Sequence, residues 1–326
     1  MTAGPGAIVC RASLFPYGNN PMSPMKATLC GLCAILIWSM LIALMRSVTE
    51  AFGATLGAAL VYSLGSFLLF LKLGLPAGTP SKPYLFVGGF FFVAYELLFS
   101  QSIGLAHDSR QTLEVGLVNY LWPCLIVVFS LIILKQKARL YLYPGLLLSF
   151  SGIVWCVSGG TFDLPLFMAH VSSNPVPYLL AFIAAVFWGL YCNVAKLFPQ
   201  PSTLVHLFFL IIAVVLWLRW FISGESLPSV PPRAFLNVLL TAVSFASSYA
   251  LWEVGIQKGN ILFLATVSYF TPIFSTLFSC VWLSVLPAPS FWYGVGMVGL
   301  GSLLSWLATH DTADASPRNA QQPRDD

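Results

Sequence analysis

The residues of this chain that could do chemistry are isolated polar side chains inside long apolar segments. Glu96 lies near the middle of one such segment, residues 84–106. A charged group at the centre of a membrane is costly, so Glu96 should face the interior of a helical bundle. It could bind the amine of a solute or carry a proton; the alternative is a structural glutamate that is protonated or hydrogen-bonded. Glu114 and Glu253 lie nearer to segment ends and are weaker indications of a functional site.

Two prolines lie inside apolar segments, Pro123 and Pro272. A proline within a helix has no N–H to bond the carbonyl four residues earlier, which here frees the carbonyls of Asn119 and Ser268. In hydrocarbon a freed carbonyl needs a partner, so either a neighbouring helix covers a simple kink or the backbone lines a water-filled cavity. Because both prolines follow a polar residue by four positions, we favour a cavity and predict a helix break at each proline.

Nine aromatic residues lie deep enough in their segments to form the wall of such a cavity. Aromatic walls with a few amides and hydroxyls suit a solute that carries both a ring and polar groups. Core packing is the alternative for any single one of them. The candidate substrate-binding residues are Trp38, Tyr95, Glu96, Asn119, Tyr120, Trp122, Trp188, Tyr191, Tyr249, Trp252, Ser268 and Tyr269.

Little in the sequence indicates catalysis or metal binding. The four histidines are scattered, and there is no H-E-x-x-H motif and no nucleotide-binding loop. Cys30 and Cys33 have the C-x-x-C spacing, but no second pair accompanies them, and a cysteine within a span behaves as a small apolar residue. We predict no catalytic residue, no metal and no cofactor, which leaves a membrane-embedded enzyme or a scaffold as the less favoured class.

The apolar segments define the fold class. Hydrophobic residues make up 58% of the chain and charged residues 8%, against roughly 45–50% and 25% in soluble domains. A helix needs about 20 mostly apolar residues to cross a bilayer, and continuous apolar runs indicate helices rather than barrel strands. We predict an all-α membrane protein with ten transmembrane helices. The predicted spans are 27–45, 54–75, 84–106, 112–134, 141–158, 176–197, 202–223, 234–256, 261–286 and 290–309.

The second half of the chain repeats the first. Trp38 matches Trp188 at a shift of 150 residues, and at a shift of 149 Tyr120 matches Tyr269, Pro123 matches Pro272, Gly145 matches Gly294 and Gly152 matches Gly301. Since five spans per repeat is an odd number, the second copy must enter the membrane from the opposite side. We predict two inverted five-helix repeats, residues 26–160 and 176–309, joined by a periplasmic linker at 161–175, with the substrate between them.

Positive charges orient this bundle. With the N-terminus in the cytoplasm, eleven Lys and Arg residues lie on the cytoplasmic side and four on the other. Those four are Arg46, Arg110, Arg219 and Arg233. The asymmetry follows the positive-inside rule and predicts cytoplasmic termini, so the net charge of +4 says nothing about nucleic acid.

Both ends of the chain, residues 1–25 and 310–326, are expected to be disordered because they are polar or rich in Gly and Pro. No cleavable signal peptide is recognisable before the first span, so that span should be retained. Met22 or Met25 is an alternative start to Met1.

Five sequence strings point to a family. They are KATLCGLCAILIWS at 26–39, AYE at 94–96, EVGLVNYLWP at 114–123, YFTP at 269–272 and GSLLSWLAT at 301–309. With them, residues 26–309 resemble the YddG-type aromatic amino acid exporters of the drug/metabolite transporter superfamily. The resemblance implies two EamA-type repeats, a place in the bacterial inner membrane, and export of phenylalanine, tyrosine, tryptophan and related compounds.

Carried over residue by residue, the resemblance implies a central cavity. Its members would be Trp38, Tyr95, Asn119, Tyr120, Trp122, Trp188, Ser268 and Tyr269. Glu253 departs from the family pattern, where a polar uncharged residue is expected, and the first 21 residues have no counterpart.

We therefore expect an exporter of aromatic amino acids that works by alternating access, without a nucleic-acid partner. The alternative within the same fold is an exporter of many drugs or metabolites. Proton antiport and facilitated diffusion both remain open, because one central carboxylate is compatible with either. The oligomeric state and the resting conformation also remain open.

Overall fold

The computed structural model describes residues 23–75, 81–135, 138–198, 204–259, 264 and 267–314. Within these ranges the chain forms helices and turns and no strand. The termini that the sequence predicts to be disordered lie largely outside them. At the margins, the first helix begins at Pro24 and the last continues to Asp314.

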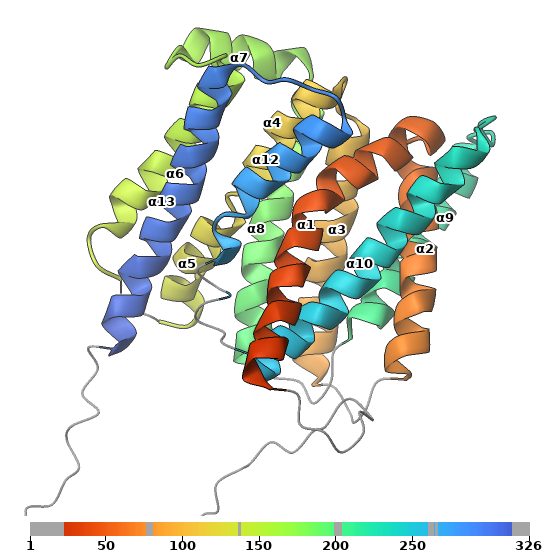
Figure 1. The fold of residues 1–326 in the computed structure, drawn as a ribbon, viewed down its shortest axis with the longest axis horizontal. Helices are drawn as coiled ribbons and strands as arrows, with labels where there is room; N and C mark the ends of the chain where they lie inside the picture. Colours follow the sequence, from red (N-terminus) through yellow and green to blue (C-terminus); the bar gives the residue numbers. More distant parts are fainter. Residues whose placement is uncertain are drawn as a thin grey trace, which may run out of the picture.

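The helices follow one another along the chain as antiparallel and oblique rods (Figure 1). They are α1 (Pro24–Phe52), α2 (Ala54–Leu73), the π-helix η1 (Tyr84–Gly88), α3 (Gly89–Gly104), α4 (Ser109–Asn119), α5 (Trp122–Ile133), α6 (Leu142–Val157), α7 (Leu164–Ser173), α8 (Pro175–Leu197), α9 (Val205–Ser223), α10 (Pro232–Lys258), α12 (Thr271–Trp282) and α13 (Pro289–Asp314). The helix α7 lies across one end of the bundle, and α1 starts and α13 ends at the opposite end (Figure 1).

Eight helical segments are long and apolar enough to cross a membrane. They are Pro24–Phe52, Ala54–Leu73, Tyr84–Gly104, Ser109–Ile133, Pro175–Leu197, Val205–Ser223, Pro232–Trp252 and Pro289–Ala308. Two further apolar helices, α6 and α12, are shorter than a full span and coincide with predicted spans at 141–158 and 261–286. The prediction of an all-helical, multi-pass membrane protein is confirmed.

The helical structure is interrupted at both midspan prolines. The helix α4 ends at Asn119 and α5 starts at Trp122, with Pro123 in its first turn; Pro272 likewise lies in the first turn of α12. Proline suits a first turn because its missing N–H would have no helical partner there. At the second break the Thr271 hydroxyl donates to the carbonyl of Ser268 over 2.5 Å, which satisfies the carbonyl that Pro272 leaves free.

Helix contacts between the two halves of the chain occur in matching pairs. A shift of about 150 residues relates α1 to α8, α3 to α10, and α5 to α12. The contact of α1 with α10 then has its counterpart in α8 with α3, and α1 with α12 in α8 with α5. The same shift relates α2 to α9 and α6 to α13. The two helices of each of these pairs pack directly on each other.

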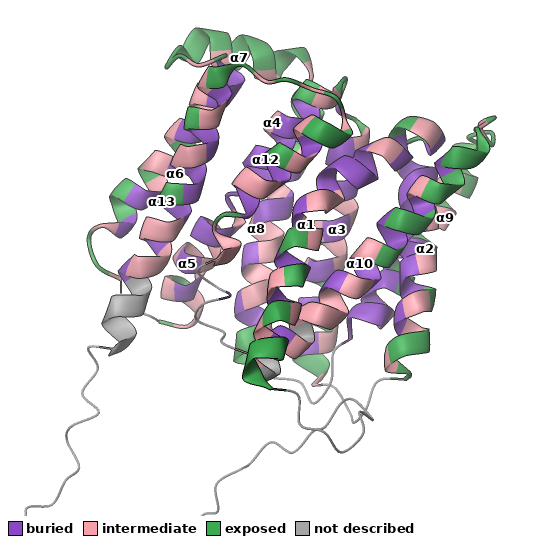
Figure 2. Cartoon of the chain, viewed as in Figure 1, coloured by how far each residue is buried: buried purple, intermediate pink, exposed green. Residues whose placement is uncertain are grey.

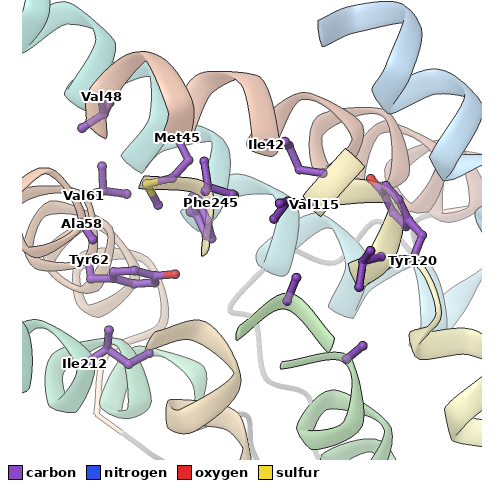
Figure 3. Packing of buried hydrophobic residues seen from close by; sticks show 14 of the residues in the cluster. Ile42, Met45, Val48, Ala58, Val61, Tyr62, Val115, Tyr120, Ile212 and Phe245 are labelled. Atoms are coloured by element: carbon purple, nitrogen blue, oxygen red, sulfur yellow. The ribbon is translucent and has the colours of Figure 1, made fainter. Parts of the chain in front are cut away.

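Buried residues lie on the inward faces of the helices and exposed residues on the outward faces (Figure 2). Many outward residues are large and apolar; Leu71, Ile132, Ile222 and Val281, for example, are more than two-thirds exposed. A soluble domain would bury such side chains, whereas a membrane protein places them against lipid. The main buried cluster joins α1, α2, α4, α9 and α10, as Figure 3 shows around Met45, Tyr62 and Phe245.

The helices α6 and α13 approach each other through glycines. A Cβ atom on Gly152 would lie 2.6 Å from the Gly294 carbonyl oxygen, and one on Gly145 would lie 2.9 Å from that of Gly301. Small residues are the usual means of such close approach in membranes. Gly296 on α13 has nothing within 4 Å of the equivalent position.

Gly152→Val should therefore destabilise the α6–α13 pair by roughly 1–3 kcal/mol, the usual cost of forcing extra volume into a packed interface. Thermal unfolding of the purified protein in detergent would show this as a lowered midpoint. The control is Gly296→Val, which carries the same helix-propensity cost without the clash. Equal midpoints for the two variants would contradict the close approach.

Candidate functional site

A cavity of about 130 Å³ lies in the middle of the bundle. About 10–15 Å³ is enough for one water molecule, so several waters or part of a small solute fit. The cavity is bounded by α1, α2, α3, α8 and α10 and by the two proline breaks. Ten of the twelve candidate residues line it: Trp38, Tyr95, Glu96, Asn119, Tyr120, Trp122, Trp188, Tyr249, Trp252 and Ser268.

Glu96 on α3 joins three helices at the cavity wall. Its carboxylate accepts hydrogen bonds from the phenols of Tyr62 on α2, at 2.7 Å, and of Tyr249 on α10, at 2.9 Å. The glutamate is 2% exposed, and each of its oxygens has one of the two donors. A carboxylate offers about four acceptor sites, so the two phenols leave capacity for a further donor from the cavity.

Asn119 ends α4 at the first break and lines the cavity. The residue is 3% exposed, and its Oδ1 atom has no hydrogen-bond partner among the described residues. Leaving a buried acceptor unpaired costs about 1–3 kcal/mol. An unpaired buried acceptor in a native structure calls for an explanation. One explanation is that a bound solute supplies the hydrogen-bond donor.

Aromatic side chains cover two sides of the cavity. On one side the Trp38 ring lies 4.9 Å from the ring of Trp252 and 5.8 Å from that of Tyr249. On the other side the Trp188 ring lies 4.7 Å from that of Tyr95 and 6.4 Å from that of Trp122. Aromatic rings prefer such tilted and edge-on neighbours, so a further ring could pack between the two groups.

Two candidate residues lie behind the wall and do not line the cavity. The Tyr191 hydroxyl is 3.1 Å from that of Tyr84, and its ring packs on Trp188 at 5.3 Å. The Tyr269 ring faces Trp306 of α13 at 5.9 Å. Tyr191 shares a helix face with Trp188 but lies one turn further along, which carries it past the cavity.

Several lining residues were missed by the sequence analysis. They are Leu41, Ile42, Met45, Tyr62, Phe99, Ser100, Ile103, Phe245 and Thr271. Tyr62 could have been predicted from the sequence, since it is a polar aromatic residue deep in the predicted span 54–75. The apolar ones look like any packing residue. The Glu253 side chain lies outside the described part of the structure.

Metal binding would need a cluster of His, Cys, Asp or Glu side chains. Within the described ranges, no group of three or more such side chains could hold a metal ion. Cys30 and Cys33 are free thiols.

A membrane-embedded helical bundle that encloses a polar, ring-lined cavity is the architecture of a small-molecule transporter. Comparison with known proteins agrees with this class. The sequence pattern of the EamA-like transporter family matches residues 176–307.

Three relatives carry the name aromatic amino acid exporter YddG. That of Salmonella typhimurium is 38% identical over 88% of this chain and 99% of its own length. That of Escherichia coli K12 is 37% identical over 88% and 99%, and that of Ancylobacter novellus is 29% identical over 78% and 88%. A solved crystal structure with 27% identity superposes with a TM-score of 0.61 and covers 89% of this chain and 99% of that one.

This chain belongs to the YddG family of EamA-like transporters. The family resemblance seen in the sequence strings is confirmed, and the protein is a transporter rather than an enzyme.

Proposed function

We propose that this protein exports phenylalanine, tyrosine, tryptophan and related compounds from the cytoplasm by alternating access. The observation that carries the proposal is the cavity itself, where aromatic walls surround a carboxylate and an unpaired amide oxygen. The names of the 37–38% identical relatives support the same substrate class.

In this proposal the ring of the solute packs between the Trp38 and Trp188 sides of the cavity. Its ammonium group donates to Glu96 and to Asn119 Oδ1, and the Ser268 hydroxyl meets the carboxylate. Hydrogen bonds to a charged group contribute about 1.5–3 kcal/mol each, so these contacts discriminate against a solute that lacks the ammonium. The aromatic walls discriminate against a solute that lacks the ring.

We further propose that the bundle consists of two inverted five-helix repeats, residues 26–160 and 176–309, with α6 and α12 completing ten spans. The exchange of helix contacts between the halves supports this arrangement. So do the paired proline breaks, which lie at the same place in each half. Rocking of one repeat against the other around the cavity would then alternate its access.

We place the protein in the inner membrane with both termini in the cytoplasm. Lys72 and Lys196 lie in the last turns of α2 and α8, at the end of the bundle opposite α7. Arg110 and Arg233 lie in the first turns of α4 and α10, at the α7 end. The lysine-rich end is then cytoplasmic by the positive-inside rule, and α7 is periplasmic.

Reconstitution in liposomes tests the function. We expect saturable transport of labelled tryptophan that excess phenylalanine inhibits, and little transport of labelled alanine or of a cationic dye. Empty liposomes are the control, and a repeat with an imposed pH gradient shows whether protons are coupled. Transport of the dye without tryptophan would instead support a broad drug and metabolite exporter.

Asn119→Ala should weaken tryptophan binding about tenfold, which is about 1.4 kcal/mol, and should lower the thermal midpoint less than the control variant Asn193→Ala does. The Oδ1 atom that the variant removes has no partner in the described structure, so the empty protein loses only the hydrogen bond between this side chain and Tyr95. Titration calorimetry and thermal unfolding in detergent measure the two quantities.

Asn193→Ala is the matched control. The Asn193 amide is 2% exposed and donates to the carbonyls of Ile126 and Gly189, at 3.1 and 2.9 Å. Its loss should lower the midpoint and leave tryptophan affinity unchanged. If Asn119→Ala behaves in the same way, its amide is structural and does not bind solute.

A further inference from the structure

A series of hollows continues from the central cavity toward the α7 end of the bundle. The central cavity shares Ile42 and Tyr120 with a small hollow of about 10 Å³. This α4–α12 hollow is lined by Ile42, Leu113, Gly116, Leu117, Tyr120, Ser275, Thr276 and Ser279. Leu113 in turn also lines a larger, open pocket of about 570 Å³ near α7.

The residues along this series are in helical order. On α4 and its end, Tyr120 lines the central cavity and Leu113 the outer pocket. On α12, Thr271 lines the central cavity, and Ser275 and Ser279 line the hollow. At about 1.5 Å of rise per residue, the seven positions from Tyr120 to Leu113 span roughly 10 Å. The hollow therefore lies between the central cavity and the outer pocket.

The barrier within the hollow is made of side chains. A volume of about 10 Å³ is the space of one water molecule, so the hollow is closed to a ring. A Cβ atom on Gly116 would lie 2.9 Å from Cδ1 of Ile42, the tip of a side chain that can change rotamer. Ile42 and Tyr120 are both drawn in Figure 3, on α1 and at the α4–α5 break.

The opposite end of the cavity is closed more firmly. There α1 and α10 touch through their backbones, since a Cβ atom on Gly255 would lie 2.7 Å from the Cα atom of Gly31. The Tyr84 and Tyr191 hydroxyls, 3.1 Å apart, tie α8 to η1 at the same end. Opening toward α7 needs side-chain rotation, whereas opening toward the lysine-rich end needs two helices to separate.

The hollow also presents polar groups along its α12 face. Ser279 is fully buried, and its hydroxyl oxygen has no partner in the part of the chain that is described. The Ser275 hydroxyl bonds the Tyr120 phenol and so links α12 to the α4–α5 break. Within the described structure this Ser279 hydroxyl is therefore available to a polar group that passes when the hollow widens.

We propose that the solute leaves the central cavity between α4 and α12, through an outer gate formed by Ile42, Leu113 and Tyr120. The hydroxyls of Ser275 and Ser279 receive its polar groups as it passes the gate. The outer pocket, which carries both signs of charge in Asp108 and Arg110, then releases it to water. This inference rests on the proposed export of aromatic amino acids and adds its route.

Gly116→Met tests the route by filling the hollow. Tryptophan binding to the purified variant should stay within about threefold of wild type, because Ile42 is the one cavity residue that the new side chain displaces and the polar and ring-bearing residues are untouched. Transport in liposomes should fall at least tenfold. The control is Gly296→Met, which meets open space and should transport within twofold of wild type. Transport by Gly116→Met at the wild-type rate would overturn the route.

Ser279→Cys gives a second test that does not depend on Gly116→Met folding. Cells loaded with labelled tryptophan are treated from outside with a cationic methanethiosulfonate, and efflux should fall at least fivefold for this variant. Because the free Cys156 lines the outer pocket, the variants are made in a Cys156→Ser background. That parent protein and Leu277→Cys, on the exposed face of the same helix, should be unaffected. Unimpaired efflux from the treated Ser279→Cys variant would overturn the route. Lack of tryptophan transport by the wild-type protein would overturn the proposed function, and the route with it.

Discussion

Glu96→Gln should lower tryptophan transport about 100-fold, which corresponds to about 2.7 kcal/mol, while the protein stays folded. The glutamine amide has the same shape, and it can accept from one phenol and donate to the other. Both contacts, with Tyr62 and Tyr249, are therefore kept, and only the negative charge is removed. A loss of this size would show that the charge itself acts on the solute or carries a proton.

Initial transport rates in liposomes and thermal midpoints in detergent measure the effect. Glu50→Gln is the control, since Glu50 is a half-exposed carboxylate that pairs with Arg46 at 2.7 Å, near the end of α1. It should transport within twofold of wild type. If Glu96→Gln also does so, Glu96 is a structural glutamate that only holds its two tyrosines, which is the alternative that the sequence left open.

Trp122→Ala should lower tryptophan transport by about 30-fold with little loss of stability. Trp122 is partly exposed to the cavity, and its ring has an edge-on contact with Trp188 at 6.4 Å. Trp188 itself packs on Tyr95, Tyr191 and Trp122, so its removal would also disturb the wall. Stacking on an aromatic ring contributes about 0.5–1.5 kcal/mol beyond the apolar area that it buries, and the two together account for about 2 kcal/mol.

Competition by phenylalanine and titration of tryptophan binding would separate affinity from turnover in Trp122→Ala. The control is Trp220→Ala, in which a tryptophan near the α7 end of α9 is removed away from the cavity. Wild-type transport by Trp122→Ala would refute the assignment of this residue to the substrate wall. Equal losses in both variants would indicate a general effect of deleting a tryptophan.

Helix positions and the choice of deep polar residues were predictable because the bilayer restricts them. In hydrocarbon every backbone group must be satisfied within the helix, so a long apolar run can be little else than a span. For the same reason a buried carboxylate, a midspan proline and deep Trp and Tyr residues are conspicuous. Ten of the twelve residues selected in this way line one cavity.

The sequence was less informative where a residue's role depends on its neighbours across the bundle. Tyr191 and Trp188 share a helix face, yet only Trp188 reaches the cavity. Tyr62 and Tyr249 donate hydrogen bonds to the same carboxylate, that of Glu96, only because α2 and α10 pack around α3. The predicted span 141–158 forms a helix, α6, that is shorter than a full span, and α12, within the predicted span 261–286, starts at the proline break.

The sequence alone determined the class of protein, its helical character and the family to which it belongs, since these depend on local hydrophobicity and on residue patterns. The tertiary structure decided which polar atoms are paired, leaving Asn119 Oδ1 without a partner in the described structure while Glu96 holds two phenols. It also placed the side-chain barrier of Ile42, Leu113 and Tyr120 next to the cavity. Those features arise from contacts between helices distant in sequence, and no local pattern encodes them.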